Sequence, residues 1–325
     1  MRRREFIVAA AVTTIWPATG LAQHRPPVVG FLSSRSPIES KELVAAFNRG
    51  LNDAGFTDGQ NVRVEYRWAE GAYNRLPELA SDLVNENVTA IVAVGNTPAA
   101  HAARDATKEI PIVFVVGDDP IKAGLVDSLA RPHGNLTGIT VLFGPLAPKR
   151  FEVLFQLIPT ARSVGLLVNL SNPAAQAAIK TAQEWTGSHK LELVVQGASA
   201  ESELAVAFDS LAQQHISALV VDADPFFTTR RERLIALAAQ HSIPTMYPQR
   251  IFVSNGGLIS YGGDLRSGYR DAGGYIGRII QGVRPGDLPV QQSTRVEFIL
   301  NLRTAKTLGL DVPTSVLLRA DEVIE

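Results

Sequence analysis

The chain contains no cysteine, which excludes disulfide bonds, thiolate catalysis and a lipid anchor on a cysteine. The nucleophile motif G-x-S-x-G, the phosphate-binding motif G-x-x-x-x-G-K-[ST], the zinc motif H-E-x-x-H and the dinucleotide motif G-x-G-x-x-G are also missing. The six histidines show no spacing that suits a metal site. The sequence therefore gives no sign of an enzyme, and neither a metal nor a cofactor is expected.

The chain also lacks a strong charge of either sign. Lys and Arg number 31 against 32 Asp and Glu, giving a net charge of −1. Without a basic surface, nucleic acid is not an expected partner. Hydrophobic residues are 46% and charged residues 19% of 325, which is typical of a globular protein with room for two domains.

The N-terminus has the pattern of an export signal. Arg2, Arg3 and Arg4 precede an apolar stretch over residues 6–15, and small residues at Gly20 and Ala22 suit cleavage before residue 23. The stretch is too short to span a bilayer, and no later segment is apolar enough to do so. The segment 1–22 is thus expected to direct export to the periplasm, by a twin-arginine-like or a Sec signal.

Two short sequence patterns each occur twice along the chain, in the same order. Val29–Leu32 leads to Ser36-Pro37, as Val164–Leu167 leads to Ser171-Asn172-Pro173. Likewise residues 88–92 lead to Ile110-Pro111, as residues 216–220 lead to Ile243-Pro244. The repeat predicts two lobes of one architecture with a cleft between them.

Apolar runs of strand length alternate with helical patterns along most of the chain. This alternation predicts an α/β fold of two Rossmann-like, doubly wound parallel sheets. A Gly-rich tail from residue 256, with a short strand expected within 256–263, is expected to cross back between the lobes. The expected N-terminal lobe is 23–142 with about 256–284, and the expected C-terminal lobe is 143–255 with about 285–325. Expected strands are 28–32, 62–66, 90–94, 112–116, 136–141, 164–169, 191–195, 218–221, 245–247 and 296–299, and expected helices are 39–54, 76–84, 98–107, 147–157, 173–186, 201–213, 226–241, 265–281 and 301–308.

Polar residues cluster where predicted strands end, and such ends meet on one rim of a parallel sheet. Gly95, Asn96 and Thr97 stand between a strand and a helix, where free N–H groups and the helix dipole attract an anion such as a carboxylate. The alternative is that Asn96 or Thr97 only caps the helix. Further candidates of the same kind are Ser33, Ser34, Asn169 and Ser171.

Carboxylates and tyrosines complete the candidate ligand-binding set. Asp118 and Asp222 follow strands in the two lobes, so each can meet a ligand ammonium, although Asp near Pro also opens ordinary turns. Tyr247 and Tyr261 lie near predicted strand ends and are candidates for stacking on an apolar or aromatic group, with core packing as the alternative. Asp222-x-Asp224 offers too few oxygens for a metal.

Six blocks of the sequence form a recognisable set: residues 116–126 (VGDDPIKAGLV), 131–138 (RPHGNLTG), 256–262 (GGLISYG), 287–292 (DLPVQQ), 301–310 (NLRTAKTLGL) and 319–325 (RADEVIE). Together they resemble the ABC-transporter substrate-binding proteins of the tryptophan-binding-protein-like group. The resemblance covers nearly the whole chain after the signal. His133 and Ser293 depart from the usual Gly and Pro of that group.

The resemblance implies a type I periplasmic binding protein fold, with two lobes joined by a hinge. It implies capture of a small solute, such as an amino acid or aromatic compound, and delivery to an inner-membrane ABC permease driven by a cytoplasmic ATPase. An exported α/β enzyme or a ligand sensor using the same cleft stays open as an alternative. A repressor effector would need a DNA-binding helix pair where the export signal stands.

Overall fold

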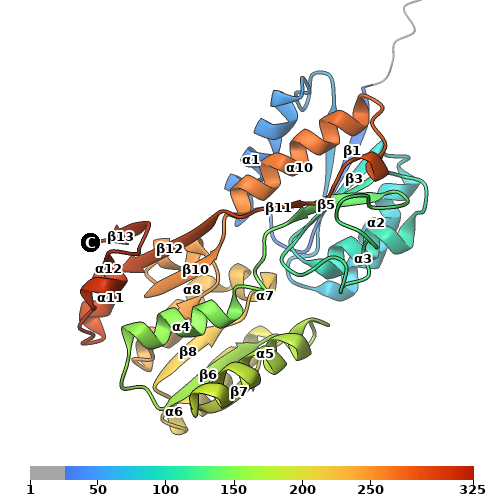
Figure 1. The fold of residues 1–325 in the computed structure, drawn as a ribbon. Helices are drawn as coiled ribbons and strands as arrows, with labels where there is room; N and C mark the ends of the chain where they lie inside the picture. The colour runs from blue at the N-terminus through green and yellow to red at the C-terminus, as the bar shows by residue number, and fades with distance from the viewer. Residues whose placement is uncertain (1–25) are drawn as a thin grey trace, which may run out of the picture.

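The computed structural model describes residues 26–325, so the expected export signal lies outside the described part of the chain. The described residues form two α/β lobes, each built on its own sheet (Figure 1). The strand orders are β11-β5-β4-β3-β1-β2 and β13-β12-β10-β9-β8-β6-β7. All strand pairs are parallel except β10 with β12. This is the doubly wound architecture that the alternating pattern predicts.

The N-terminal lobe is dominated by buried apolar strands. The runs AIVAV and IVFVV of its central strands are buried throughout, because helices cover both faces of the sheet. Its elements are β1 (Val28–Ser33), α1 (Lys41–Asp53), β2 (Arg63–Trp68), the 3₁₀ turn η1 (Tyr73–Arg75), α2 (Leu76–Asn85), β3 (Ala90–Val94), α3 (Thr97–Ala106), β4 (Ile112–Val116), β5 (Leu136–Thr140), α10 (Leu265–Ile280), η2 (Pro285–Asp287) and β11 (Gln291–Gln292).

The C-terminal lobe repeats this construction. Strands β6, β7, β8 and β9 occupy the places that β1, β2, β3 and β4 hold in the first sheet, as the internal repeat predicts. Its elements are α4 (Ala147–Leu157), β6 (Ser163–Val168), α5 (Ala175–His189), β7 (Glu192–Gly197), α6 (Glu201–Gln213), β8 (Ala218–Val221), α7 (Pro225–Thr229), α8 (Arg231–Gln240), β9 (Thr245–Tyr247), α9 (Arg250–Ser254), β10 (Ile259–Gly263), β12 (Val296–Asn301), α11 (Leu302–Thr307), α12 (Thr314–Leu317) and β13 (Glu322–Ile324).

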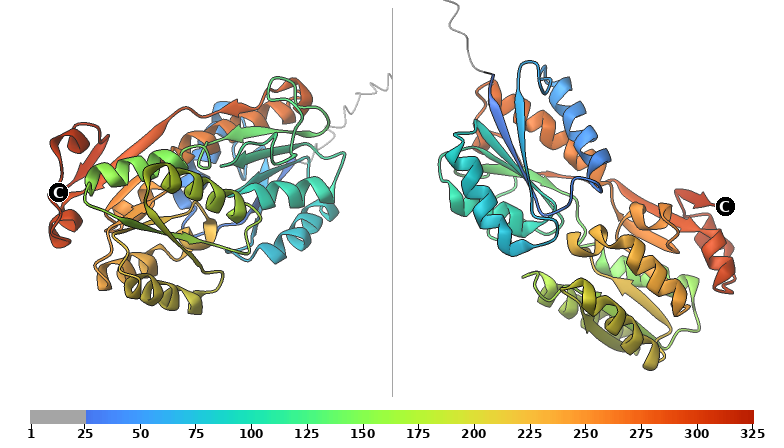
Figure 2. Two further views of the ribbon diagram at one scale, coloured as in Figure 1. Left: turned by 60° about the horizontal axis from the view of Figure 1, so that its bottom comes forward. Right: turned by 180° about the vertical axis from the view of Figure 1, so that it is seen from behind.

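The tail divides between the lobes differently from the expectation. The segment 256–284 was expected in the N-terminal lobe, but β10 pairs with β9 and β12 of the second sheet. Conversely, β11 pairs with β5 of the first sheet. The chain thus crosses between the lobes after β5, after β10 and after β11. The right-hand view of Figure 2 shows the two lobes side by side. The short strand expected within 256–263 is β10, but the sequence pattern does not show the sheet to which it belongs. Strand β11 was not expected, because two residues show no pattern.

Some short elements also differ from the expected ones. The helix expected over 226–241 is divided at Arg230 into α7 and α8. Helices α9 and α12 and strand β13 were not expected, because each is too short to show a periodic pattern.

Helices α1 and α10 pack closely on one face of the first sheet. A Cβ atom built on Gly273 would lie 2.1 Å from the carbonyl oxygen of Phe47, whereas one built on Gly274 meets nothing nearer than 4.0 Å. The two glycines are adjacent on one helix, so they form a matched pair that separates close packing from helix propensity.

We therefore expect Gly273→Ala to destabilise the protein by about 2–3 kcal/mol, because one helix must move away from the other. We expect Gly274→Ala to stabilise it by about 0.5–1 kcal/mol, because alanine favours a helix interior. Urea unfolding of both variants checks this, and equal effects from the two would contradict the described packing.

Candidate functional site

A cavity of about 660 Å³ lies between the lobes at the carboxyl ends of the parallel strands. This volume is within the usual range for small-molecule sites. Most of its wall is apolar, with Phe143 as a large aromatic member, and the Lys, Arg and Asp side chains in its lining are Arg35, Asp118, Asp119, Lys122 and Asp222. Among the predicted site residues, those that line it are Gly95, Asn96, Thr97, Asp118 and Asp222.

The N-terminal lobe contributes the turn between β3 and α3. Gly95 has φ +103°, and a Cβ there would lie 2.2 Å from Oγ of Ser34, so the turn needs glycine. Asn96 caps α3 by accepting a hydrogen bond from the Ala99 N–H at 3.3 Å. The structure therefore contains the cap that the sequence offered as an alternative, although Asn96 also lines the cavity.

Asp118 stands beside this helix terminus. The Thr97 hydroxyl donates to Oδ2 of Asp118 at 2.7 Å, and the Thr140 hydroxyl donates to its carbonyl oxygen at 3.0 Å. The carboxylate is thus fixed next to the positive end of α3. A second anion at this terminus would meet the charge of Asp118, so the geometry favours a cation as the guest of the N-terminal lobe.

The C-terminal lobe contributes Asp222 at the end of β8. Burial raises the pKa of Asp222 to about 6, although the nearby Arg150 guanidinium and the Ala223 N–H oppose the rise. Arg150 lies on α4 and is only 1% exposed. Burial lowers the pKa of Arg150 to about 10, so it is charged at neutral pH.

Asp224 connects the two lobes at the side of the cleft away from the crossings. Its carboxylate accepts from the Tyr73 hydroxyl of the N-terminal lobe at 2.6 Å, and from Nδ2 of Asn172 at 2.7 Å. It also accepts from Nδ2 of Asn169 at 3.2 Å and from the Phe226 N–H at 2.8 Å. Burial raises the pKa of Asp224 despite these donors. The Tyr73 bond therefore joins a buried network of one lobe to the other lobe.

Glu39 adds to this interlobe contact. Burial raises the pKa of Glu39, while Arg35 of its own lobe and the Thr229 hydroxyl of the other lobe oppose the rise. Arg35 and Glu39 form an ion pair at 3.7 Å, and Arg35 also lines the cavity. The lobes thus meet through polar contacts opposite the crossings.

The remaining predicted site residues do not line the cavity. Ser33 accepts from the Arg35 N–H at 3.1 Å, and Ser34 packs under Gly95. Asn169 and Ser171 bond each other at 2.7 Å within the network around Asp224. These four side chains hold the turns that carry cavity residues.

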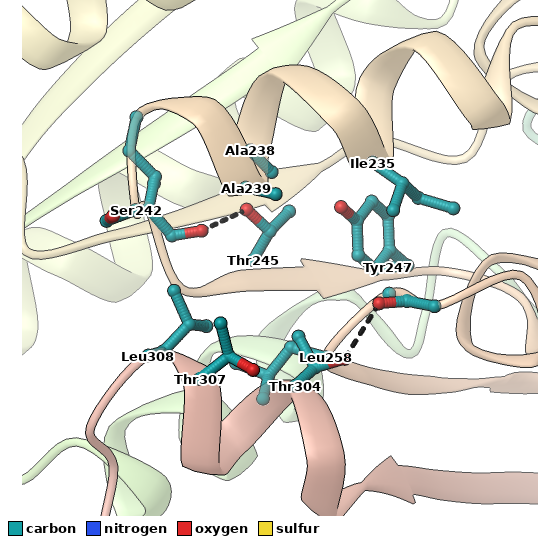
Figure 3. A pocket seen from close by; sticks show the side chains of 13 residues that line it. Ile235, Ala238, Ala239, Ser242, Thr245, Tyr247, Leu258, Thr304, Thr307 and Leu308 are labelled. Atoms are coloured by element: carbon teal, nitrogen blue, oxygen red, sulfur yellow. Dashed lines mark hydrogen bonds between the residues drawn. The ribbon is translucent and has the colours of Figure 1, made fainter.

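The two predicted tyrosines lie in or against the core of the C-terminal lobe. Tyr247 is 1% exposed and stacks on Phe252 with ring centroids 4.7 Å apart. Figure 3 shows Tyr247 beside Ile235, in a separate pocket of about 70 Å³ below α8. Tyr261 packs edge-on against Phe298. The alternative of core packing thus describes both, because each faces away from the cavity.

Sequence reasoning missed several residues of the site. Arg35, Phe143 and Gln249 line the cavity, Arg150 stands close to Asp222, and Tyr73 bonds Asp224 of the other lobe. Arg35 and Phe143 follow predicted strands closely, so their position after a strand end was an available signal. Tyr73 and Arg150 lie in a turn and on a helix, where the sequence carries no such signal.

Within residues 26–325, no group of His, Asp and Glu is arranged to hold a metal ion. The same part of the chain has no helix with the length and apolar character needed to cross a membrane.

Comparison with known proteins gives the family. The model of the ABC transporter substrate binding proteins matches residues 35–324. A tyrosine-binding protein of Clostridioides difficile (strain R20291) is 31% identical over 265 residues, covering 81% of this chain and 75% of that protein. This chain therefore belongs to the ABC transporter substrate-binding protein family, a family of binding proteins and not of enzymes.

Solved structures agree on the fold. A Streptococcus pneumonia domain in complex with L-Trp has a TM-score of 0.84 at 24% identity, covering 92% of this chain and 100% of that one. A ligand-free, open structure of a Clostridium difficile substrate binding protein with adhesive properties has a TM-score of 0.66 at 24% identity, covering 92% and 99%. More distant structures include a periplasmic binding protein and a transcription regulator. The fold is the type I periplasmic-binding-protein fold.

Proposed function

We propose that this protein is the periplasmic solute-binding component of an ABC importer, and that it captures an α-amino acid, preferably an aromatic one, between its lobes. The proposal rests mainly on the observation that Asp118 and Asp222, from different lobes, line one largely apolar cavity. Two carboxylates suit the ammonium of an amino acid, and the apolar wall around Phe143 suits its side chain. The names of relatives that bind tyrosine or tryptophan support the same class of solute.

Closure of the lobes is the proposed functional event. The hinge consists of the crossings after β5, β10 and β11, and the Tyr73–Asp224 bond holds the opposite side. The better agreement with the L-Trp complex than with the open structure, at equal identity, supports a closed arrangement here. A permease in the inner membrane, driven by a cytoplasmic ATPase, is the proposed partner.

Thermal unfolding of residues 23–325 against a panel of L-amino acids, aromatic acids, short peptides and sugars tests the proposed solute. An aromatic amino acid held at a hundredfold excess over its dissociation constant should stabilise the protein by about 2.7 kcal/mol. Small-angle scattering with and without that amino acid should show a more compact molecule when it is bound. A shift with sugars only, or none with any amino acid, would contradict the proposed solute class.

A further inference from the structure

Arg150 carries a buried positive charge, and two of its three guanidinium nitrogens have no hydrogen-bond partner in the described part of the chain. Its side chain is 1% exposed, and its Nε and Nη1 atoms are buried and unpaired. A guanidinium has five N–H donors and is among the groups least often left unsatisfied inside a protein. An enclosed, unpaired cation of this kind calls for an anionic partner.

The position of Arg150 links it to the cavity. Ala147 precedes it by three residues on α4, so the two side chains share a helix face, and Ala147 lines the cavity. Asp222 lines the cavity too and is near enough for each group to shift the pKa of the other. The two nevertheless form no ion pair among residues 26–325.

The helix terminus that the sequence offers for a carboxylate is already in use. Asn96 caps α3, and Thr97 donates to Asp118, whose negative charge lies at that terminus. A ligand carboxylate placed there would meet Asp118 at close range, and like charges repel strongly in a partly desolvated site. The carboxylate of an amino acid therefore needs a cation elsewhere in the cleft. Of the two Lys and Arg side chains that line the cavity, Arg35 already pairs with Glu39 and Lys122 is exposed to solvent.

We propose that Arg150 receives the carboxylate of the bound amino acid while its ammonium binds between Asp222 and Asp118, so that the C-terminal lobe contacts both charges and the N-terminal lobe closes on the ammonium. The inference rests on the proposed function, because it needs an amino acid in the cleft. Arg150 is enclosed and does not itself line the cavity, so the contact requires a change of its side-chain rotamer. A planar guanidinium pairs with a carboxylate through two parallel hydrogen bonds, which gives specificity as well as affinity.

A purely structural role makes a different prediction. If Arg150 only keeps Asp222 ionised, its loss weakens every ligand that carries an ammonium, whether or not the ligand also has a carboxylate. Amines that lack the carboxylate of the matching amino acid therefore separate the two roles.

The test measures dissociation constants of L-tryptophan and tryptamine, and of L-tyrosine and tyramine, by isothermal titration calorimetry. The proteins are wild type, Arg150→Met and Arg150→Lys, with Lys149→Met as the control. Lys149 precedes Arg150 on α4 and pairs with Glu152 at 2.6 Å on the surface, so its replacement makes the same charge change away from the cleft.

We expect wild type and Lys149→Met to bind each amino acid roughly 10- to 100-fold more tightly than its amine, the size of a charged hydrogen-bonded pair. In Arg150→Met this ratio should fall to about one, and in Arg150→Lys it should be intermediate. An unchanged ratio in Arg150→Met, with both ligands weakened alike, would overturn the role of Arg150 but leave the proposed function intact. Wild type that binds none of the amino acids would overturn both. If Arg150→Met does not fold, the ratio in Arg150→Lys decides.

Discussion

Asp222→Asn is expected to weaken the binding of an α-amino acid on the order of 100-fold at pH 7.5, while stabilising the protein measured without ligand. The affinity falls because the ligand ammonium loses a partly buried charged partner. The stability rises because burial disfavours the ionised form of Asp222, as its raised pKa of about 6 indicates. Residues in functional clefts commonly lower the stability of the fold while they raise the affinity for a ligand.

The pH dependence has a defined sign. The ordinary pKa of Asp222 is 3.8 and its pKa in the folded protein is about 6, so the folded state holds the proton more tightly. The free energy of unfolding of wild type should therefore decrease as pH rises from about 4 to above 6, by on the order of 1–3 kcal/mol for this group. The affinity for an amino acid should instead decrease as pH falls below about 6, because Asp222 then gains a proton and loses its charge.

The measurement is a pair of pH series, one by chemical unfolding and one by calorimetric titration of the ligand. Asp222→Asn should lack the loss of stability between pH 4 and 6 and should bind weakly at every pH. Asp105→Asn, at the exposed end of α3, serves as the control and should follow wild type in both series. Equal affinities of wild type and Asp222→Asn at pH 7.5 would remove Asp222 from the ligand site.

The two-lobed fold follows from the sequence because its signals are local and repeated. Buried runs such as those of β3 and β4 can be recognised one at a time, and their order gives parallel sheets. The division of the tail between the lobes depends instead on strand pairing. Strand β10 is weak in apolar pattern and β11 has two residues, so only their partners reveal the sheet to which each belongs.

The site was predictable to the extent that it consists of strand ends. Asp118 and Asp222 follow β4 and β8, and parallel strands bring such ends to one rim. No comparable rule predicts from sequence which way a single aromatic side chain points. Tyr247 and Tyr261 also lie on strands, but the Tyr247 ring is buried in the core and the Tyr261 ring packs against it. Successive side chains of a strand face opposite sides of the sheet, so a place on a strand does not by itself direct a ring to the cavity.

Asp224→Ala and Tyr73→Phe should separate the stability of one lobe from the closure of both. Asp224 is 1% exposed and satisfies donors on Asn169, Asn172 and Phe226 of its own lobe. Its removal leaves these donors buried and unpaired, so we expect a loss of about 3–5 kcal/mol in urea unfolding. Tyr73→Phe removes only one hydrogen bond between the lobes and none within them, so the loss of stability should stay below about 1 kcal/mol.

Tyr73→Phe, which costs little stability, should nevertheless change the balance between the open and closed forms. Tyr73→Phe keeps both lobes intact but loses a bond made only when they meet, so affinity for the solute should fall about tenfold and scattering should show a more open molecule before ligand is added. Ser81→Ala is a suitable control, because its hydroxyl donates within α2 to the Pro77 carbonyl at 2.9 Å, and Ser81 neither lines the cavity nor joins the lobes. If Tyr73→Phe matched wild type in both affinity and compactness, the Tyr73–Asp224 bond would be a passive contact and the hinge alone would set the balance between open and closed forms.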